Sequence, residues 1–162
     1  MDLPTPRHPG TYRIAVVCLG NICRSPMAEV VLTAHLERAG LADAVVVDSS
    51  GTGGWHVGSP MDERAAGILG AQGYDASRHR AARFTSSRAM EHDLVLAMDA
   101  TNEADLRRLG VEERLRRFRD FDPEGPGDVP DPYYGGHDGF ADVLAMVERT
   151  SDALVTALKG LP

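Results

Sequence analysis

The stretch that decides the fold is Arg13-Ile14-Ala15-Val16-Val17-Cys18-Leu19-Gly20-Asn21-Ile22-Cys23-Arg24-Ser25-Pro26. Its first six residues form a continuous run rich in β-branched residues, which is typical of a strand buried on both faces. Pro26 then stands where the first turn of a helix tolerates proline, and apolar residues follow at helical spacing as far as Ala39, before a stop at Gly40. Residues 18–25 are therefore expected to form a loop between the carboxyl end of a strand and the N-terminus of a helix.

The rest of the chain continues to alternate between strand and helix patterns. Short apolar runs predict three more strands, at 45–48, at 94–98 and, more weakly, at 115–118. Apolar residues at helical spacing predict three more helices, at 61–72, at 101–109 and at 140–158, the last interrupted by Ser151. This alternation predicts an α/β fold, with a four-stranded parallel sheet covered by helices on both faces in a single three-layer domain. Ligands of such sheets bind beyond the carboxyl ends of the strands, where the loop after Cys18 is expected to lie.

Length and charge limit the classes of protein to which the chain can belong. Its 162 residues fit one domain, which we place at 12–162, and the Pro-rich stretch 1–11 predicts a flexible N-terminal extension. A formal net charge of −7 argues against binding to nucleic acid or to an anionic membrane. The only lysine is Lys159, so the lysine that a P-loop nucleotide site requires is missing.

The cysteines and the apolar runs bear on where the protein works. The two cysteines stand five positions apart, which is not the pattern of a secreted disulfide scaffold. No apolar run reaches the length of a membrane span, and the first one lacks the basic flank of a signal peptide. We therefore expect a cytoplasmic protein, with secretion by a route that needs no signal peptide left open.

The loop after the first strand has the residue types of an anion site that contains a nucleophile. Five residues between Cys18 and Arg24 require the backbone to wrap back on itself, so that successive N–H groups and the positive end of the helix point inward. The planar fork of Arg24 matches two phosphoryl oxygens. Gly20 and Asn21 tolerate the left-handed backbone that such a wrap needs. The positive environment favours the thiolate of Cys18, which is the nucleophilic form, and Ser25 is placed to hydrogen-bond it.

Two other interpretations of these cysteines remain. Cys18 and Cys23 would read as inert buried thiols if Arg24-Ser25-Pro26 did not follow them. Half of a zinc site is the second alternative, but no other cysteine and no nearby histidine pair can complete four ligands. We expect neither a metal ion nor another cofactor.

Four strings together resemble one family. The run from Val17 to Glu29 resembles the signature of low-molecular-weight protein tyrosine phosphatases. Three more strings match in order: Asp48-Ser49-Ser50-Gly51-Thr52, Trp55-His56-Val57-Gly58 and Asp131-Pro132-Tyr133-Tyr134-Gly135. The resemblance covers residues 13 to about 158. It implies the Rossmann-like phosphotyrosine phosphatase I fold and hydrolysis of phosphotyrosine through a phosphocysteine intermediate.

The same resemblance assigns roles to individual residues. It implies that Cys18 is the nucleophile, that Arg24 binds phosphate and that Asp131 is the general acid and base; without it, Asp128, Asp131 and Asp138 are equal candidates. The implied phosphate loop contains Leu19, Gly20, Asn21, Ile22, Cys23 and Ser25. The implied substrate pocket contains Trp55, His56, Tyr133 and Tyr134. The implied supports of the loop are Ser49, His79 and, more weakly, Asp99.

Blander interpretations exist for the pocket and the supports. Trp55, Tyr133 and Tyr134 could be core packing, although the glycines around Trp55 predict an exposed loop. Ser49 and His79 could be ordinary hydrogen-bonded polar residues. Whether the two tyrosines are themselves phosphorylated is left open.

Three rival functions share parts of this pattern. Thioredoxin-coupled arsenate reductases of the same fold need further cysteines downstream, and none follows Cys23. Protein arginine phosphatases tend to carry a small threonine where Ile22 stands and lack the paired tyrosines. A non-catalytic phosphate-binding module would need no nucleophile. We therefore expect tyrosine-phosphorylated proteins or peptides as partners, a monomer with at most weak self-association, and redox control through a Cys18–Cys23 disulfide.

Overall fold

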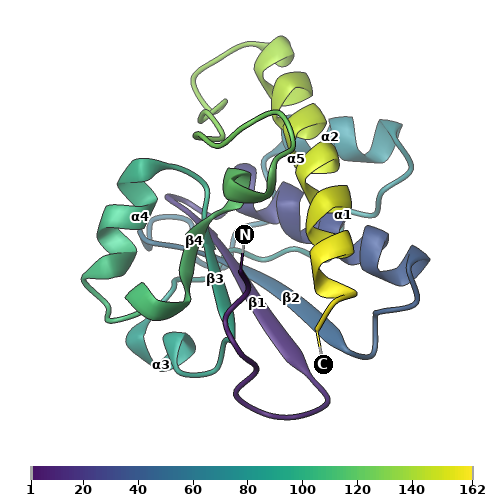
Figure 1. Cartoon of the computed structure of the whole chain (residues 1–162). Coiled ribbons are helices and arrows are strands. Elements are labelled where there is room, and N and C mark those ends of the chain that lie inside the picture. The colour runs from purple at the N-terminus through teal and green to yellow at the C-terminus, as the bar shows by residue number, and fades with distance from the viewer. Residues whose placement is uncertain (1, 162) are drawn as a thin grey trace.

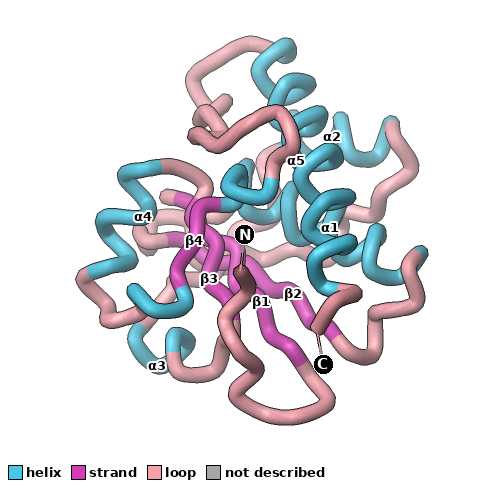
Figure 2. Tube along the Cα trace, viewed as in Figure 1, coloured by secondary structure: helices cyan, strands magenta, loops and turns pink. Residues whose placement is uncertain are grey.

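The computed structural model describes residues 2–161, and its centre is a parallel sheet of four strands (Figures 1 and 2). The strands are β1 (Tyr12–Cys18), β2 (Val45–Gly51), β3 (Leu94–Ala97) and β4 (Leu115–Arg117). They lie in the order β2-β1-β3-β4, so β1 pairs with a parallel neighbour on each side. The predicted four-stranded parallel sheet is confirmed.

Helices cover both faces of the sheet (Figure 1). The helices are α1 (Arg24–Arg38), α2 (Glu63–Ala71), α3 (Ser86–Ala89), α4 (Ala100–Arg107) and α5 (His137–Leu158), with short 3₁₀ helices η1 (Glu112–Arg114) and η2 (Phe118–Phe121). Ile14, Val16 and Cys18 of β1 belong to a core shared with α1 and α5. Ala15 and Val17 belong to a second core, shared with α3 and α4. The sheet is therefore the middle of three layers, as predicted.

Several element boundaries differ from the sequence-based expectation. Strand β2 continues beyond 45–48 to Gly51, because its polar end pairs with the last residues of β1 although it carries no apolar signal. The closing helix α5 begins at His137 and is not interrupted at Ser151, which is fully buried against the core. The short helix α3 and both 3₁₀ helices have too few residues to produce a periodic pattern, and the sequence did not predict them.

The stretch before β1 lies along the domain without forming a helix or strand. The hydroxyl of Tyr12 donates to the carbonyl of Pro4 at 2.8 Å, and the backbone N–H of Arg7 donates to Asp93 at 2.6 Å. Arg114 donates to the carbonyl of Thr5 at 2.8 Å. These contacts give the location of the segment, whereas its mobility stays a prediction. Within residues 2–161, no helix has the length and apolar character needed to cross a membrane.

Candidate active site

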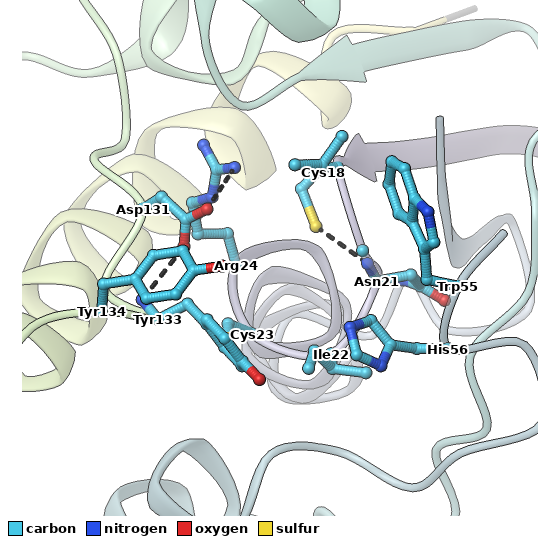
Figure 3. A pocket seen from close by; sticks show the side chains of 12 residues that line it. Cys18, Asn21, Ile22, Cys23, Arg24, Trp55, His56, Asp131, Tyr133 and Tyr134 are labelled. Carbon is cyan, nitrogen blue, oxygen red and sulfur yellow. Dashed lines mark hydrogen bonds and ion pairs between the residues drawn. The ribbon is translucent and has the colours of Figure 1, made fainter. Parts of the chain in front are cut away.

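The loop between β1 and α1 forms the floor of a pocket of about 460 Å³ (Figure 3). It lies at the carboxyl end of β1, where parallel sheets bind ligands. The pocket is lined by Cys18, Leu19, Gly20, Asn21, Ile22, Cys23, Arg24, Trp55, His56, Asp131, Tyr133 and Tyr134. The structure thus brings together residues of three of the four strings, which are spread over more than a hundred positions of the chain. Ser25 lies behind this lining.

The sulfur of Cys18 is surrounded by hydrogen-bond donors. The backbone N–H of Asn21 donates to Sγ at 3.3 Å, and the hydroxyl of Ser25 lies 3.0 Å from it. The residue is buried, and it stands at the N-terminal side of α1, where the helix dipole is positive. The N–H of Asn21 and the positive end of the helix stabilise a negative charge on sulfur, and the hydroxyl of Ser25 can donate to it.

Asn21 is the residue around which the loop turns. Its φ of 57° is the only positive value at a residue other than glycine between positions 2 and 161. Its side-chain amide donates to the hydroxyls of Ser25 at 2.8 Å and Ser49 at 3.0 Å, and its side-chain oxygen accepts from the backbone N–H of Ala82 at 2.9 Å. Asparagine therefore supplies both the left-handed backbone and the bonds that hold it.

Gly20 has a different role from the expected one. Its φ is not positive, so it does not serve the left-handed turn. A Cβ atom at this position would lie 3.1 Å from Cδ2 of His56. A side chain at this position would require the His56 ring to move by a few tenths of an ångström, and the prediction of left-handed backbone was correct for Asn21 alone.

Two supports of the loop contact Asn21 as expected, and a third was not predicted. Nε2 of His79 lies 2.7 Å from the carbonyl of Asn21. Burial lowers the pKa of His79, and the charge of Arg80 acts in the same direction, so the ring is neutral at pH 7 and donates from Nε2. Ser49 in turn donates to Glu29 at 2.6 Å. Burial raises the pKa of the Glu29 carboxyl. Glu29 lies within the first matching string, but nothing in the sequence alone showed that it faces Ser49.

Arg24 is held at the side of the pocket by carboxylates. Nη1 donates to Asp99 at 2.5 Å and to the carbonyl of Val129 at 3.0 Å, and Nη2 lies 3.5 Å from Asp131. Burial alone would lower the pKa of Arg24, but the sulfur of Cys18 and the carboxylate of Asp99 keep it above its usual value. The guanidinium is therefore a fixed positive charge beside the sulfur. Asp99, the weaker of the expected supports, makes the shortest contact to it.

Asp131 is the one of the three candidate acids that lies in the pocket. One carboxylate oxygen accepts the backbone N–H of Tyr133 at 3.0 Å, and the other faces Arg24. Asp128 instead accepts the backbone N–H of Ala100 at 3.0 Å, outside the pocket. Asp138 lies in the first turn of α5, also outside the pocket.

Aromatic side chains form the mouth of the pocket. Tyr133 and Tyr134 meet edge to face with ring centroids 4.9 Å apart, and the ring of His56 lies 6.4 Å from that of Tyr133. Trp55 is 73% exposed and Tyr134 is 94% exposed, so neither belongs to the core. A Cβ atom at Gly53 would lie 1.9 Å from the Trp55 ring, which shows how closely the indole lies on its own loop.

Arg64 packs against Tyr133 at the mouth of the pocket and was not among the residues that the sequence predicted. Its guanidinium lies 5.5 Å from the ring centroid of Tyr133 and donates to the Tyr133 carbonyl at 2.9 Å. It also forms an ion pair with Asp62, whose backbone N–H donates to the carbonyl of Ile22 in the loop. Because these contacts join three distant segments, no local sequence pattern could have indicated them.

Cys23 is a thiol on the inner side of the loop. Burial raises its pKa to about 12, and the negative charge of Asp62 adds to this effect. It is therefore protonated at neutral pH and is not a competing nucleophile. Both cysteines are free. In residues 2–161, no cluster of three or more His, Cys, Asp or Glu side chains could hold a metal ion.

Comparisons with known proteins place these features in context. Residues 13–160 match the family described as "Low molecular weight phosphotyrosine protein phosphatase". A low molecular weight protein-tyrosine-phosphatase of Streptomyces coelicolor is 49% identical over 156 residues, covering 92% of this chain and 94% of the relative. The crystal structure of a protein tyrosine phosphatase from Entamoeba histolytica superposes with a TM-score of 0.88 at 31% identity, covering 92% of this chain and 97% of the other.

A phosphatase with a different substrate has the same fold. The structure of the YwlE arginine phosphatase, a Bacillus subtilis protein, superposes with a TM-score of 0.82 at 28% identity, covering 91% of this chain and 96% of the other. Its active-site serine, introduced by mutation, is phosphorylated. The fold is therefore shared by more than one phosphatase specificity, and the substrate must be inferred from the pocket.

Proposed function

The chain belongs to the low molecular weight protein tyrosine phosphatases, and from this premise we propose that it hydrolyses phosphotyrosine with Cys18 as nucleophile. The observation that carries the proposal is the convergence of Cys18, Arg24 and Asp131 in one pocket whose mouth is aromatic. The loop N–H groups and Arg24 would hold the phosphoryl oxygens, and Tyr133 and Tyr134 would flank the substrate ring.

The first chemical step transfers the phosphoryl group to sulfur. The thiolate of Cys18 attacks phosphorus, so that an S–P bond forms while the P–O bond to the phenol breaks. Asp131 gives its proton to the leaving oxygen, which departs as neutral tyrosine rather than as a phenolate. Arg24 stays paired with the phosphoryl oxygens during the transfer.

The second step regenerates the enzyme. Asp131, now a carboxylate, takes a proton from water, and the oxygen of that water attacks the phosphocysteine. The S–P bond breaks, inorganic phosphate leaves and the thiolate of Cys18 returns. The hydroxyl of Ser25, 3.0 Å from the sulfur, is in position to stabilise the departing thiolate.

A comparison of phosphorylated peptides tests the proposed specificity. We expect kcat/KM for a phosphotyrosine peptide to exceed that for matched phosphoserine and phosphoarginine peptides by at least about 100-fold, because a site built for one group discriminates strongly against others. Neither a serine nor an arginine side chain presents an aromatic ring to Tyr133 and Tyr134 at the mouth of the pocket. Arsenate reduction serves as a control and is expected to be absent.

Phosphoarginine is the second candidate substrate, because the arginine phosphatase has the same fold. Faster turnover of the phosphoarginine peptide would replace the proposed specificity. Ile22 lines the pocket and packs partly against the core, so it narrows the floor next to Cys18. Together with the paired tyrosines, this favours a flat aromatic substrate.

We propose reversible oxidation of Cys18 as a form of control. Peroxide would oxidise the thiolate to a sulfenic acid, with uptake of a proton and release of water, and the thiol of Cys23 would then displace water from that sulfur to close the disulfide. Burial raises the pKa of Cys23 to about 12, so this residue would react chiefly as the thiol. Mass spectrometry of peroxide-treated protein should show the Cys18–Cys23 disulfide. Equal recovery of wild type and Cys23→Ser with reductant would contradict the protective role.

Location and assembly complete the proposal. The mechanism requires Cys18 as a free thiol, which a reducing compartment preserves, so a cytoplasmic location fits best. The substrates would be tyrosine-phosphorylated proteins, with no role for nucleic acid or membrane, and the chain would act as a monomer with at most weak self-association. Cell fractionation and gel filtration check the two statements.

A further inference from the structure

The segment that carries Asp131 is long and has no helix or strand of its own. We call residues 122–136, between η2 and α5, the acid loop. In Figure 1 it is the green segment that leads from the short helix after β4 to α5. Loops of this length usually serve a function, and a proton donor must be held within hydrogen-bond reach of the oxygen it protonates. The contacts that hold the acid loop therefore determine where Asp131 lies.

The first residue of the acid loop is anchored by a buried cluster of charges. The side chain of Asp122 is fully buried and accepts two hydrogen bonds from Arg149 of α5, at 2.7 and 2.8 Å. It also accepts Nε of Arg119 at 2.9 Å and the backbone N–H of Glu124 at 2.9 Å. The Arg149 guanidinium holds the pKa of Asp122 well below its usual range, so the cluster stays charged at any pH of interest. This fixes the start of the loop to α5.

The remaining nitrogens of Arg119 reach further along the loop. Nη1 donates to the carbonyl of Asp128 at 3.0 Å, and Nη2 lies 3.4 Å from the carbonyl of Gly125. Gly127 passes close to the guanidinium, since a Cβ atom on this residue would lie 3.1 Å from Nη1 of Arg119. The φ angle of Gly127 is 149°. One guanidinium, only 16% exposed, thus closes the turn 122–128 at both ends.

Arg119 holds the carbonyl of Asp128, and the next residue, Val129, contacts Arg24 in the pocket. Val129 donates its N–H to the carbonyl of Met98 at 2.8 Å, and its own carbonyl accepts from Arg24 at 3.0 Å. Asp131 comes two residues later, with one carboxylate oxygen 3.5 Å from Arg24. A displacement at Asp128 would therefore be passed on to the atoms beside Cys18.

We propose that Arg119 is a positioning residue for proton transfer: anchored by Asp122 and Arg149, it holds the carbonyls of the acid loop and thereby sets Asp131 at the leaving oxygen. Arg119 has no contact with the sulfur and acts through its bonds to Asp122 and to the backbone carbonyls of the acid loop. The inference rests on the proposed function, since it needs Asp131 as the acid.

Leaving-group dependence tests this role, because a merely structural contact would affect all substrates alike. For Arg119→Gln, we expect kcat/KM to fall about 10- to 100-fold for an aryl phosphate whose leaving phenol has a pKa near that of tyrosine, about 10. Little change is expected for a strongly acidic phenol, which needs no proton to leave. In an Asp131→Ala background, Arg119→Gln should cause no further loss, because both changes remove the same interaction.

The matched control is Arg116→Gln. Arg116 lies on the same strand as Arg117, near Arg119, but its guanidinium donates only to the carbonyls of Glu113 and Leu115 and contacts no part of the acid loop. It should leave the leaving-group dependence unchanged. If Arg119→Gln does not fold, Arg119→Lys replaces it, because a lysine can still pair with Asp122 but cannot hold two carbonyls. The lysine variant should then show the same selective loss.

The possible failures are distinguishable. A selective loss in Asp131→Ala, without one in Arg119→Gln or in Arg119→Lys, overturns the positioning role alone. Equal losses for acidic and weakly acidic phenols in the Arg119 variants, or additive losses in the double variant, overturn it as well. An unselective loss in Asp131→Ala removes the acid assignment, and the inference about Arg119 with it.

Discussion

Cys18→Ser is expected to reduce turnover of aryl phosphates by about 10⁴-fold or more, the scale on which loss of a catalytic nucleophile is felt. A serine hydroxyl ionises only at very high pH, so it reaches the reactive form only with a general base next to it. The group beside Sγ is the hydroxyl of Ser25, at 3.0 Å, which is not a base. The substitution changes the size of the side chain little, so the loop around it should remain folded.

Two measurements show whether Cys18→Ser has lost only the nucleophile or has also lost the ability to bind phosphate. Phosphate or vanadate should still stabilise Cys18→Ser in thermal unfolding, because Arg24 and the loop N–H groups remain. In Asp131→Ala, rapid acid quenching followed by mass spectrometry should trap a phosphoryl group on Cys18, and the adduct should stay there in a Cys23→Ser background. Activity within tenfold of wild type for Cys18→Ser, or an adduct on another residue, would contradict the mechanism.

Asp131→Ala is expected to lower kcat/KM by about 10²- to 10⁴-fold for substrates with a weakly acidic leaving group, which is the usual contribution of a general acid. A phenol of pKa about 10 leaves slowly as its anion and depends on the proton, whereas a strongly acidic phenol does not. The plot of log kcat/KM against the pKa of the leaving phenol should therefore become steeper. We use kcat/KM because it covers the steps up to the phosphocysteine, before Asp131 acts as a base.

The neighbouring aspartates provide the controls for this variant. Asp138→Ala removes a carboxylate from the first turn of α5, outside the pocket, and should leave the slope of the plot unchanged. Asp128 is a poorer control, because it accepts the backbone N–H of Ala100 in α4 and carries the carbonyl held by Arg119. An equal loss for both kinds of phenol in Asp131→Ala would remove Asp131 from the acid role.

The central part of the fold could be predicted because its signals are local. A β-branched run, a short loop and a proline in the first turn lie within fourteen residues, and together they predict β1, the loop 19–23 and the start of α1. The same holds for Asn21, whose residue type already suggests left-handed backbone. At Gly20 the same argument failed, since its φ is not positive and its close neighbour, His56, comes from a distant part of the chain.

The supports of the site could be predicted only in part. Ser49 and His79 came from family resemblance, and the structure places both against Asn21. Glu29, Arg64 and Arg119 were missed, because each acts through contacts with segments that only the folded chain brings near. In a sequence, charged residues of this kind look like ordinary exposed surface residues. Only their hydrogen bonds and ion pairs in the folded structure distinguish them from such residues.

The division of β1 between two cores has a consequence for insertions and deletions. Even-numbered residues of the strand, from Ile14 to Cys18, face α1 and α5, while Ala15 and Val17 face the opposite layer. Since side chains alternate strictly along a strand, the loss or gain of one residue within β1 would exchange the two sets. The sulfur would then point toward α3 and α4, away from the N–H of Asn21 and the hydroxyl of Ser25. Catalysis by Cys18 therefore depends on the face of the sheet toward which its side chain points as well as on the reactivity of its thiol.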